Sequence, residues 1–171
     1  MKKISLIALF ILFSVIGKSF GQKLEENKTD DFTKKIVKST SWETLYTTMT
    51  ANAYFRISVN GDNEFFDLKY QEGKIFSIDK DEELMFKLDN GEIVKVLNLE
   101  YKITCEGCGS KGFIGRGAEG IQVSYPLDKE TIEKLKGHKV VKVRINITTG
   151  FYENEVKDKN AAKITASLNL L

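Results

Sequence analysis

The chain has 171 residues, hydrophobic side chains at 42% of its positions and a formal net charge of +2 at neutral pH. This length suits one domain with a core large enough to fold without disulfides or metals. The first 21 residues carry three lysines and no acid, so the remaining 150 carry a formal charge of −1, and we expect neither nucleic acid nor an anionic membrane as a partner.

The N-terminal 21 residues have the pattern of a secretory signal peptide. Two lysines precede an apolar run at residues 4–16, and the small residues Ser19 and Gly21 suit a signal peptidase. The run is too short to span a bilayer, which takes roughly 20 apolar residues. No cysteine follows the cleavage region, so we expect no lipoprotein anchor. We predict cleavage near Gly21 and Gln22 and a periplasmic or secreted bacterial protein with no stable membrane insertion.

Residues 22–35 are mostly charged or polar, with only Leu24 and Phe32 to bury. Such a segment buries too little apolar surface to offset the entropy lost on ordering. We predict a flexible charged leader here, followed by a single β-rich domain over residues 36–171.

Apolar and polar residues alternate in short segments after residue 50, which is the two-residue period of half-buried strands. Asn60-Gly61 separates the first two segments and is a strong hairpin signal, because both residues tolerate positive φ. Strands at this spacing predict a mainly β fold, an antiparallel β-sandwich or a flattened barrel. The expected strands are residues 53–59, 65–70, 75–78, 84–88, 93–99, 101–104, 121–127 and 141–147, the last with Val141, Val143, Ile145 and Ile147 on its buried face.

A short helix is predicted over about residues 128–136. Asp128 can cap the first-turn amides, and Glu130 and Lys134 are spaced for an ion pair one turn apart. Gly137 suits a left-handed helix exit.

The last segment, residues 160–171, has two interpretations. Alternating apolar residues are typical of a strand, whereas Asn160 before two alanines is typical of a helix start. We expect a C-terminal helix packed on the edge of the sandwich.

The Gly-rich segment at residues 104–120 holds both cysteines and six of the thirteen glycines. In the oxidising compartment outside the cytoplasm, Cys105 and Cys108 are expected to form a disulfide. Metal binding is an alternative, but a zinc site needs four ligands and His138 is the only other soft candidate, so it would be shared by two copies. Redox catalysis is a further alternative. In redox proteins the first cysteine of such a pair normally lies at the start of a helix, and the glycines of this segment disfavour a helix.

Residues 115–120 match the G-x-G-x-x-G pattern of dinucleotide-binding folds, which requires a helix next. The expected strand at 121–127 argues for an ordinary loop, in which Lys111, Arg116 and backbone amides could hold an anion. Phe113 is either an anchor for a partner or a plug that folds onto the sandwich.

No set of residues predicts an enzyme, because the single histidine has neither a nucleophile nor an orienting acid marked beside it, and we expect no cofactor. The leading hypothesis is a non-enzymatic binding module of the cell envelope that contacts a protein partner or small ligand through Lys111, Phe113 and Arg116 in the 104–120 loop. The alternative is a redox or metal-binding protein that uses Cys105 and Cys108. A structural or chaperone-like envelope protein is a third class, and would expose apolar sheet faces.

Overall fold

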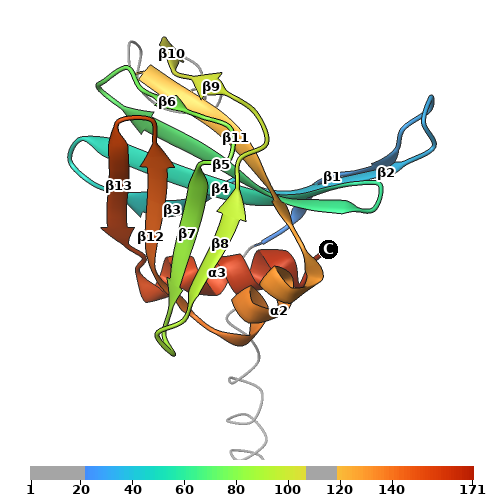
Figure 1. Cartoon of the computed structure of the whole chain (residues 1–171). Helices are drawn as coiled ribbons and strands as arrows, with labels where there is room; N and C mark the ends of the chain where they lie inside the picture. The colour runs from blue at the N-terminus through green and yellow to red at the C-terminus, as the bar shows by residue number, and fades with distance from the viewer. Residues whose placement is uncertain (1–21, 107–118) are drawn as a thin grey trace, which may run out of the picture.

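The computed structural model describes residues 22–106 and 119–171. Two antiparallel β-sheets pack in a sandwich-like arrangement, and two helices lie together at one end of it (Figure 1). This confirms the mainly β fold with one short and one C-terminal helix. Within the described residues, no helix has the length and apolar character needed to cross a bilayer.

The larger sheet has the strand order β1-β2-β4-β5-β11-β10, and β3 pairs with β4 beside β2. The smaller sheet has the order β13-β12-β7-β8, and β6 and β9 form a separate two-stranded sheet. The strands of the larger sheet are β1 (Leu24–Thr29), β2 (Ile36–Thr40), β3 (Glu43–Thr47), β4 (Ala51–Asn60), β5 (Asn63–Glu72), β10 (Cys105–Glu106) and β11 (Glu119–Leu127). The others are β6 (Ser77–Ile78), β7 (Glu83–Leu88), β8 (Ile93–Leu97), β9 (Lys102–Ile103), β12 (Val140–Ile147) and β13 (Gly150–Glu155).

The core lies between the two sheets and is built from the alternating apolar positions of their strands. Phe55 of β4 stacks on Phe66 of β5 with ring centroids 5.3 Å apart. Phe66 in turn meets Phe86 of β7 edge-on at 5.0 Å, which links the larger sheet to the smaller one. The hairpin signal at Asn60-Gly61 is confirmed, because β4 and β5 are joined there and Gly61 has a φ of +64°.

The helices follow the sequence signals in most respects. Helix α2 (Lys129–Gly137) begins after Asp128, whose carboxylate accepts a 2.7 Å hydrogen bond from the Thr131 amide. Glu130 and Lys134 form the expected ion pair at 2.7 Å. The prediction of a left-handed exit at Gly137 is wrong, because the chain leaves the helix in an extended conformation at His138.

Helix α3 (Asp158–Leu168) resolves the ambiguity at the C-terminus in favour of a helix. Asn160 is not its cap, since the helix begins after Lys157. The buried Asn160 side chain instead donates a 3.1 Å hydrogen bond to the Leu45 carbonyl of β3, which ties the first turn of α3 to the larger sheet.

The structure differs from the expected leader at residues 22–35, because residues 24–29 form strand β1. Its side chains are almost all exposed, and the strand is held by the backbone ladder to β2, in which Thr29 is opposite Ile36. A ladder satisfies backbone groups without apolar burial, so the composition of the segment did not reveal it.

Two strands also differ in detail. A β-bulge between Val140 and Lys142 leaves Val141 half-buried and brings Val140 into the core in its place. The strand expected over residues 93–99 ends at Leu97, the last residue of β8. The buried side-chain amide of Asn98 follows it and donates hydrogen bonds to the carbonyls of Asp79, at 2.9 Å, and Glu100. Strand β13 had no clear signal in the sequence.

Candidate binding surfaces

The segment expected to be the contact loop is described only at its two ends. Cys105 lies in β10 and is opposite Gly120 of β11, so the segment starts and ends on neighbouring strands of the larger sheet. Cys108, Lys111, Phe113 and Arg116 lie outside the described residues. The disulfide, the metal and redox alternatives, and the contact role of this loop therefore stay predictions.

The glycine pattern at residues 115–120 is not followed by the helix that a dinucleotide-binding fold requires. This agrees with the expectation from the sequence. Strand β11 begins at Glu119, so the pattern at residues 115–120 runs into a strand and not into a helix.

His138 follows the last turn of α2 and is half-exposed. Its Nδ1 atom lies 3.4 Å from the Asp89 carboxylate. In residues 22–106 and 119–171, no three histidine, cysteine, aspartate or glutamate side chains gather in an arrangement that could hold a metal ion.

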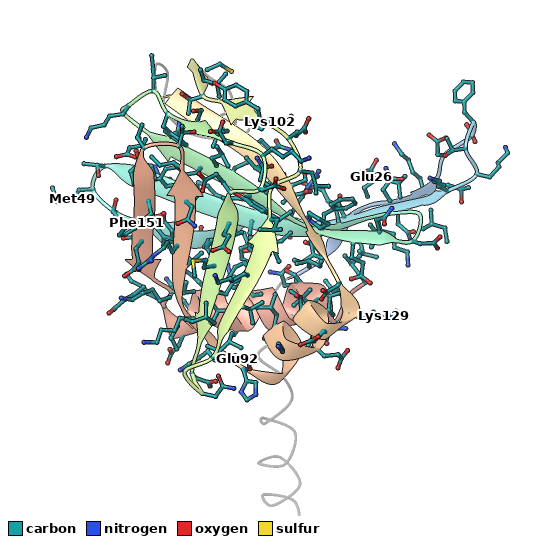
Figure 2. The ribbon with its side chains drawn as sticks, in the orientation of Figure 1. Glu26, Met49, Glu92, Lys102, Lys129 and Phe151 are labelled. Carbon is teal, nitrogen blue, oxygen red and sulfur yellow. The ribbon has the colours of Figure 1, made fainter. Side chains whose placement is uncertain are left out.

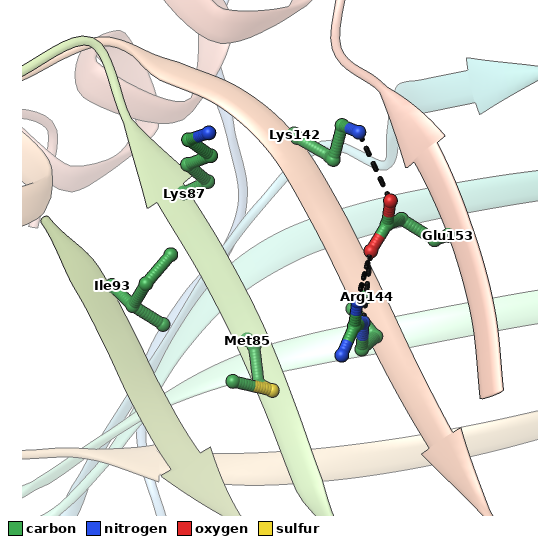
Figure 3. A pocket seen from close by; sticks show the side chains of 6 residues that line it. All are labelled: Met85, Lys87, Ile93, Lys142, Arg144 and Glu153. Atoms are coloured by element: carbon green, nitrogen blue, oxygen red, sulfur yellow. Dashed lines mark hydrogen bonds and ion pairs between the residues drawn. The ribbon is translucent and has the colours of Figure 1, made fainter. Parts of the chain in front are cut away.

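A basic pocket lies on the outer face of the smaller sheet, away from the core (Figure 3). Its volume is about 360 Å³, which is in the lower range for ligand pockets. Side chains from four strands line it because alternate residues of a strand point to the same face of the sheet. The lining residues are Met85 and Lys87 of β7, Ile93 of β8, Lys142 and Arg144 of β12 and Glu153 of β13.

In the basic pocket, the Glu153 carboxylate forms ion pairs with two cationic side chains. Glu153 accepts hydrogen bonds from Lys142 Nζ at 2.9 Å and from Arg144 Nη2 at 2.6 Å and Nε at 2.8 Å (Figure 3). Lys142 and then Arg144 lower the pKa of Glu153 from its ordinary value of 4.5. The carboxylate is therefore ionised at neutral pH and fully engaged by these two side chains.

Lys87 adds a third cation to the basic pocket. It lies directly opposite Lys142 in the β7–β12 ladder, and both side chains belong to the outer face. Like charges directly opposite each other in a sheet are destabilising. No carboxylate of the described residues is within ion-pair distance of Lys87, so the pocket holds three cations and one anion.

Apolar side chains border these charges. The Phe151 side chain is 56% exposed and stands at the surface of the smaller sheet (Figure 2), with the Arg144 guanidinium 4.2 Å from its ring centroid. Ile93 is also exposed, and Met85 is half-buried. The surface therefore combines positive charge with an aromatic ring and two aliphatic side chains.

A second polar cluster lies on the outer face of the larger sheet, beside a cavity of about 300 Å³. The buried Asp67 carboxylate accepts hydrogen bonds from Ser124 Oγ at 2.6 Å and from Arg56 Nε at 2.8 Å. Arg56 and Lys69 both lie over the ring of Trp42, at 4.9 and 4.1 Å from its centroid. Burial and then Arg56 lower the pKa of Lys69. Both oxygens of the carboxylate are engaged within the chain, which is typical of a structural network.

Comparisons with known proteins add no relationship: no family model, curated protein or solved structure matches this chain. The functional argument consequently depends on the surfaces described above.

Part of the basic pocket could be recognised from the sequence. Lys142 and Arg144 occupy the outward positions of the clearest strand in the chain. Lys87 is far from them in the sequence, and only the pairing of β7 with β12 brings the three cations together.

Proposed function

We propose that this chain is an exported, non-enzymatic binding module of the bacterial cell envelope, and that its basic pocket binds an acidic segment of a partner protein. The observation that carries the proposal is the position of Lys87 opposite Lys142, with Glu153 as the one carboxylate of the pocket. A bound carboxylate between the two lysines would relieve their repulsion, so the free energy of that contact favours an anionic ligand.

The apolar border of the pocket supports a protein segment as the ligand. Phe151, Ile93 and Met85 offer contact to an apolar or aromatic side chain next to the acidic one. A free phosphate ion would not contact these apolar side chains. Nucleic acid is also disfavoured as the ligand, because the formal charge of −1 on residues 22–171 gives no long-range attraction for it.

The Gly-rich loop at residues 104–120 is proposed as a second contact region, with Lys111, Phe113 and Arg116 as its contact residues. The pairing of Cys105 with Gly120 at the base of the loop supports this role. Recognition loops are usually positioned by a rigid scaffold of this kind.

The proposal is tested by fluorescence anisotropy with a labelled synthetic peptide of alternating glutamate and phenylalanine. The peptide should bind the processed protein, and Arg144→Glu should weaken binding by about tenfold or more, because it reverses a charge in the pocket. Added salt should weaken binding as well, since the contact is partly electrostatic and exposed.

Lys74→Glu is the matched control, because Lys74 is an exposed lysine outside the pocket. It makes the same change in net charge and should leave the affinity within about twofold. Equal weakening by both variants would mean that only net charge matters, and would overturn the pocket as the binding site. No binding by the unmodified protein would overturn the proposed ligand class.

A further inference from the structure

The β1–β2 hairpin extends beyond the rest of the larger sheet as an arm. Strand β1 pairs only with β2, and the last pair that links β2 to β4 is Val37 with Asn60. Residues 28–36 lie at or past this point, where the Ile36 carbonyl still accepts a 2.9 Å hydrogen bond from the Gly61 amide, and the arm points away from the sandwich (Figure 1). We call residues 28–36 the arm.

The tip of the arm has a fixed geometry. The Asp30 carboxylate accepts hydrogen bonds from the amides of Phe32, at 3.1 Å, and Thr33, at 2.6 Å, and from the Thr33 hydroxyl at 2.8 Å. The Lys34 amide bonds to the Asp30 carbonyl at 2.9 Å, and Lys34 has a φ of +59°. The side chain of Asp30 thus holds the turn in the way of an Asx-turn.

This turn presents an aromatic ring and a carboxylate to the solvent. Phe32 is 97% exposed, which is unusual for a phenylalanine in an ordered turn. Asp31 is exposed, and no hydrogen bond or ion pair joins it to any described residue. Lys35 turns back along the hairpin, with its side chain beside Gly61.

We propose that Asp31 and Phe32 at the tip of the arm bind in the basic pocket of a second copy of this chain. This inference rests on the proposed function, and it names the acidic partner segment. Asp31 supplies a carboxylate for Lys87, which has none within ion-pair distance in the described residues, and adds a second one beside Lys142, which already pairs with Glu153. Phe32 supplies a ring for Met85, Ile93 and Phe151.

The contact must be between molecules, because the arm points away from the smaller sheet that bears the pocket (Figure 1). Each copy can place its arm in the pocket of another copy and receive an arm in its own pocket. The arm and the pocket are two different surfaces, so the contact either is reciprocal between two copies, which closes a two-fold dimer, or continues from copy to copy as a larger ring or an open chain.

The first experiment is sedimentation velocity of the processed protein over a range of concentrations. The unmodified protein should form dimers or larger species as its concentration rises. Phe32→Ser and Arg144→Glu should each weaken self-association by about tenfold or more, since aromatic and arginine anchors dominate such contacts. Met49→Ser is the control for the arm, because Met49 is an equally exposed apolar residue on the β3–β4 hairpin (Figure 2). Lys74→Glu is the control for the pocket.

The decisive experiment mixes the two variants. Arg144→Glu protein keeps its arm and Phe32→Ser protein keeps its pocket, so an equimolar mixture should give one-to-one heterodimers and nothing larger. Circular dichroism of each variant checks that it is folded.

The outcomes separate this inference from the proposed function. A monomeric unmodified protein that still binds the acidic peptide in its pocket would overturn self-association and leave the proposed function intact. Self-association that persists in both variants would overturn the arm–pocket contact. Failure of peptide binding together with a monomeric protein would overturn both.

Discussion

Phe66 of the larger sheet meets Phe86 of the smaller sheet with ring centroids 5.0 Å apart and planes inclined at 67°. Both side chains have no exposed surface, and Phe66 also stacks on Phe55. Edge-on aromatic contacts of this kind add to the stabilisation that comes from apolar burial. This contact joins the two layers inside the core, so both rings contribute to the packing of one sheet on the other.

Phe66→Ala should therefore destabilise the protein strongly. We expect the free energy of unfolding to fall by about 3–5 kcal/mol, because the variant loses buried apolar surface and leaves a cavity between the sheets. Urea denaturation followed by circular dichroism measures the change. Phe151→Ala is the control, since this ring is exposed, and it should cost less than about 1 kcal/mol. Equal effects of the two changes would contradict the central position of Phe66.

Asp67 should be more important for stability than the surface carboxylates. Its side chain is 4% exposed and bonds to both Arg56 and Ser124. Asp67→Ala leaves the Arg56 guanidinium without its partner, so we expect a loss of about 2–4 kcal/mol. Glu83→Ala removes the exposed pair with Lys95 and should cost at most about 1 kcal/mol.

A double-mutant cycle tests whether this effect comes from the Arg56–Asp67 pair. Arg56→Ala together with Asp67→Ala should cost less than the sum of the single changes, because the double variant leaves no charge without its partner. Strictly additive losses would show that the two residues act independently and that the 2.8 Å contact contributes little.

Local signals in the sequence predicted those parts of the fold whose physical cause is also local. The Asn60-Gly61 hairpin needs a positive φ, which Gly61 adopts at +64°. The start of α2 needs an acceptor for its free amides, which Asp128 supplies to Thr131. In both cases the residues that create the structure are neighbours in the chain.

Features that depend on pairing between distant segments could not be predicted in the same way. The basic pocket exists because the register of β7 and β12 places Lys87 opposite Lys142. The bulge that brings Val140 inward in place of Val141 depends on the same pairing. Strand β1 could not be expected from its own composition, because β2 supplies its backbone partners.

Four tyrosines should ionise at a higher pH in the folded protein than in the unfolded chain. The stability of the protein should therefore fall at alkaline pH. Burial raises the pKa of Tyr46 from 10.0 to about 12. Burial also raises the pKa of Tyr70, Tyr125 and Tyr152, and the Glu72 carboxylate, which accepts a 3.1 Å hydrogen bond from the Tyr70 hydroxyl, adds to the shift of Tyr70. Each of these groups stays neutral in the folded protein at a pH where the unfolded chain has begun to ionise.

The sign of the effect follows from proton binding. Above the ordinary pKa of 10.0 these tyrosines bind fewer protons in the unfolded chain than in the folded one, so their contribution to stability is constant below that pH and falls as pH rises above it. Absorbance at about 295 nm should show fewer tyrosinates at about pH 11 in the folded protein than in guanidinium, where all six ionise normally. Urea midpoints should be lower at about pH 11 than at about pH 9. Equal titration of folded and unfolded protein would contradict the burial of these hydroxyl groups.

The predicted signal peptide and the expected disulfide lead to one prediction about the mass of the protein purified after export. The purified protein should begin at Gln22, and its mass should be lower than that of the reduced chain by two hydrogens, because we expect Cys105 and Cys108 to form a disulfide after export. Intact-mass spectrometry before and after reduction measures both properties. Cys105→Ser with Cys108→Ser should leave the unfolding free energy within about 1 kcal/mol, because a loop this small restricts the unfolded chain little. Two free thiols in the exported protein, or a mass that includes a metal ion shared by two copies, would contradict the disulfide and favour the redox or metal alternative.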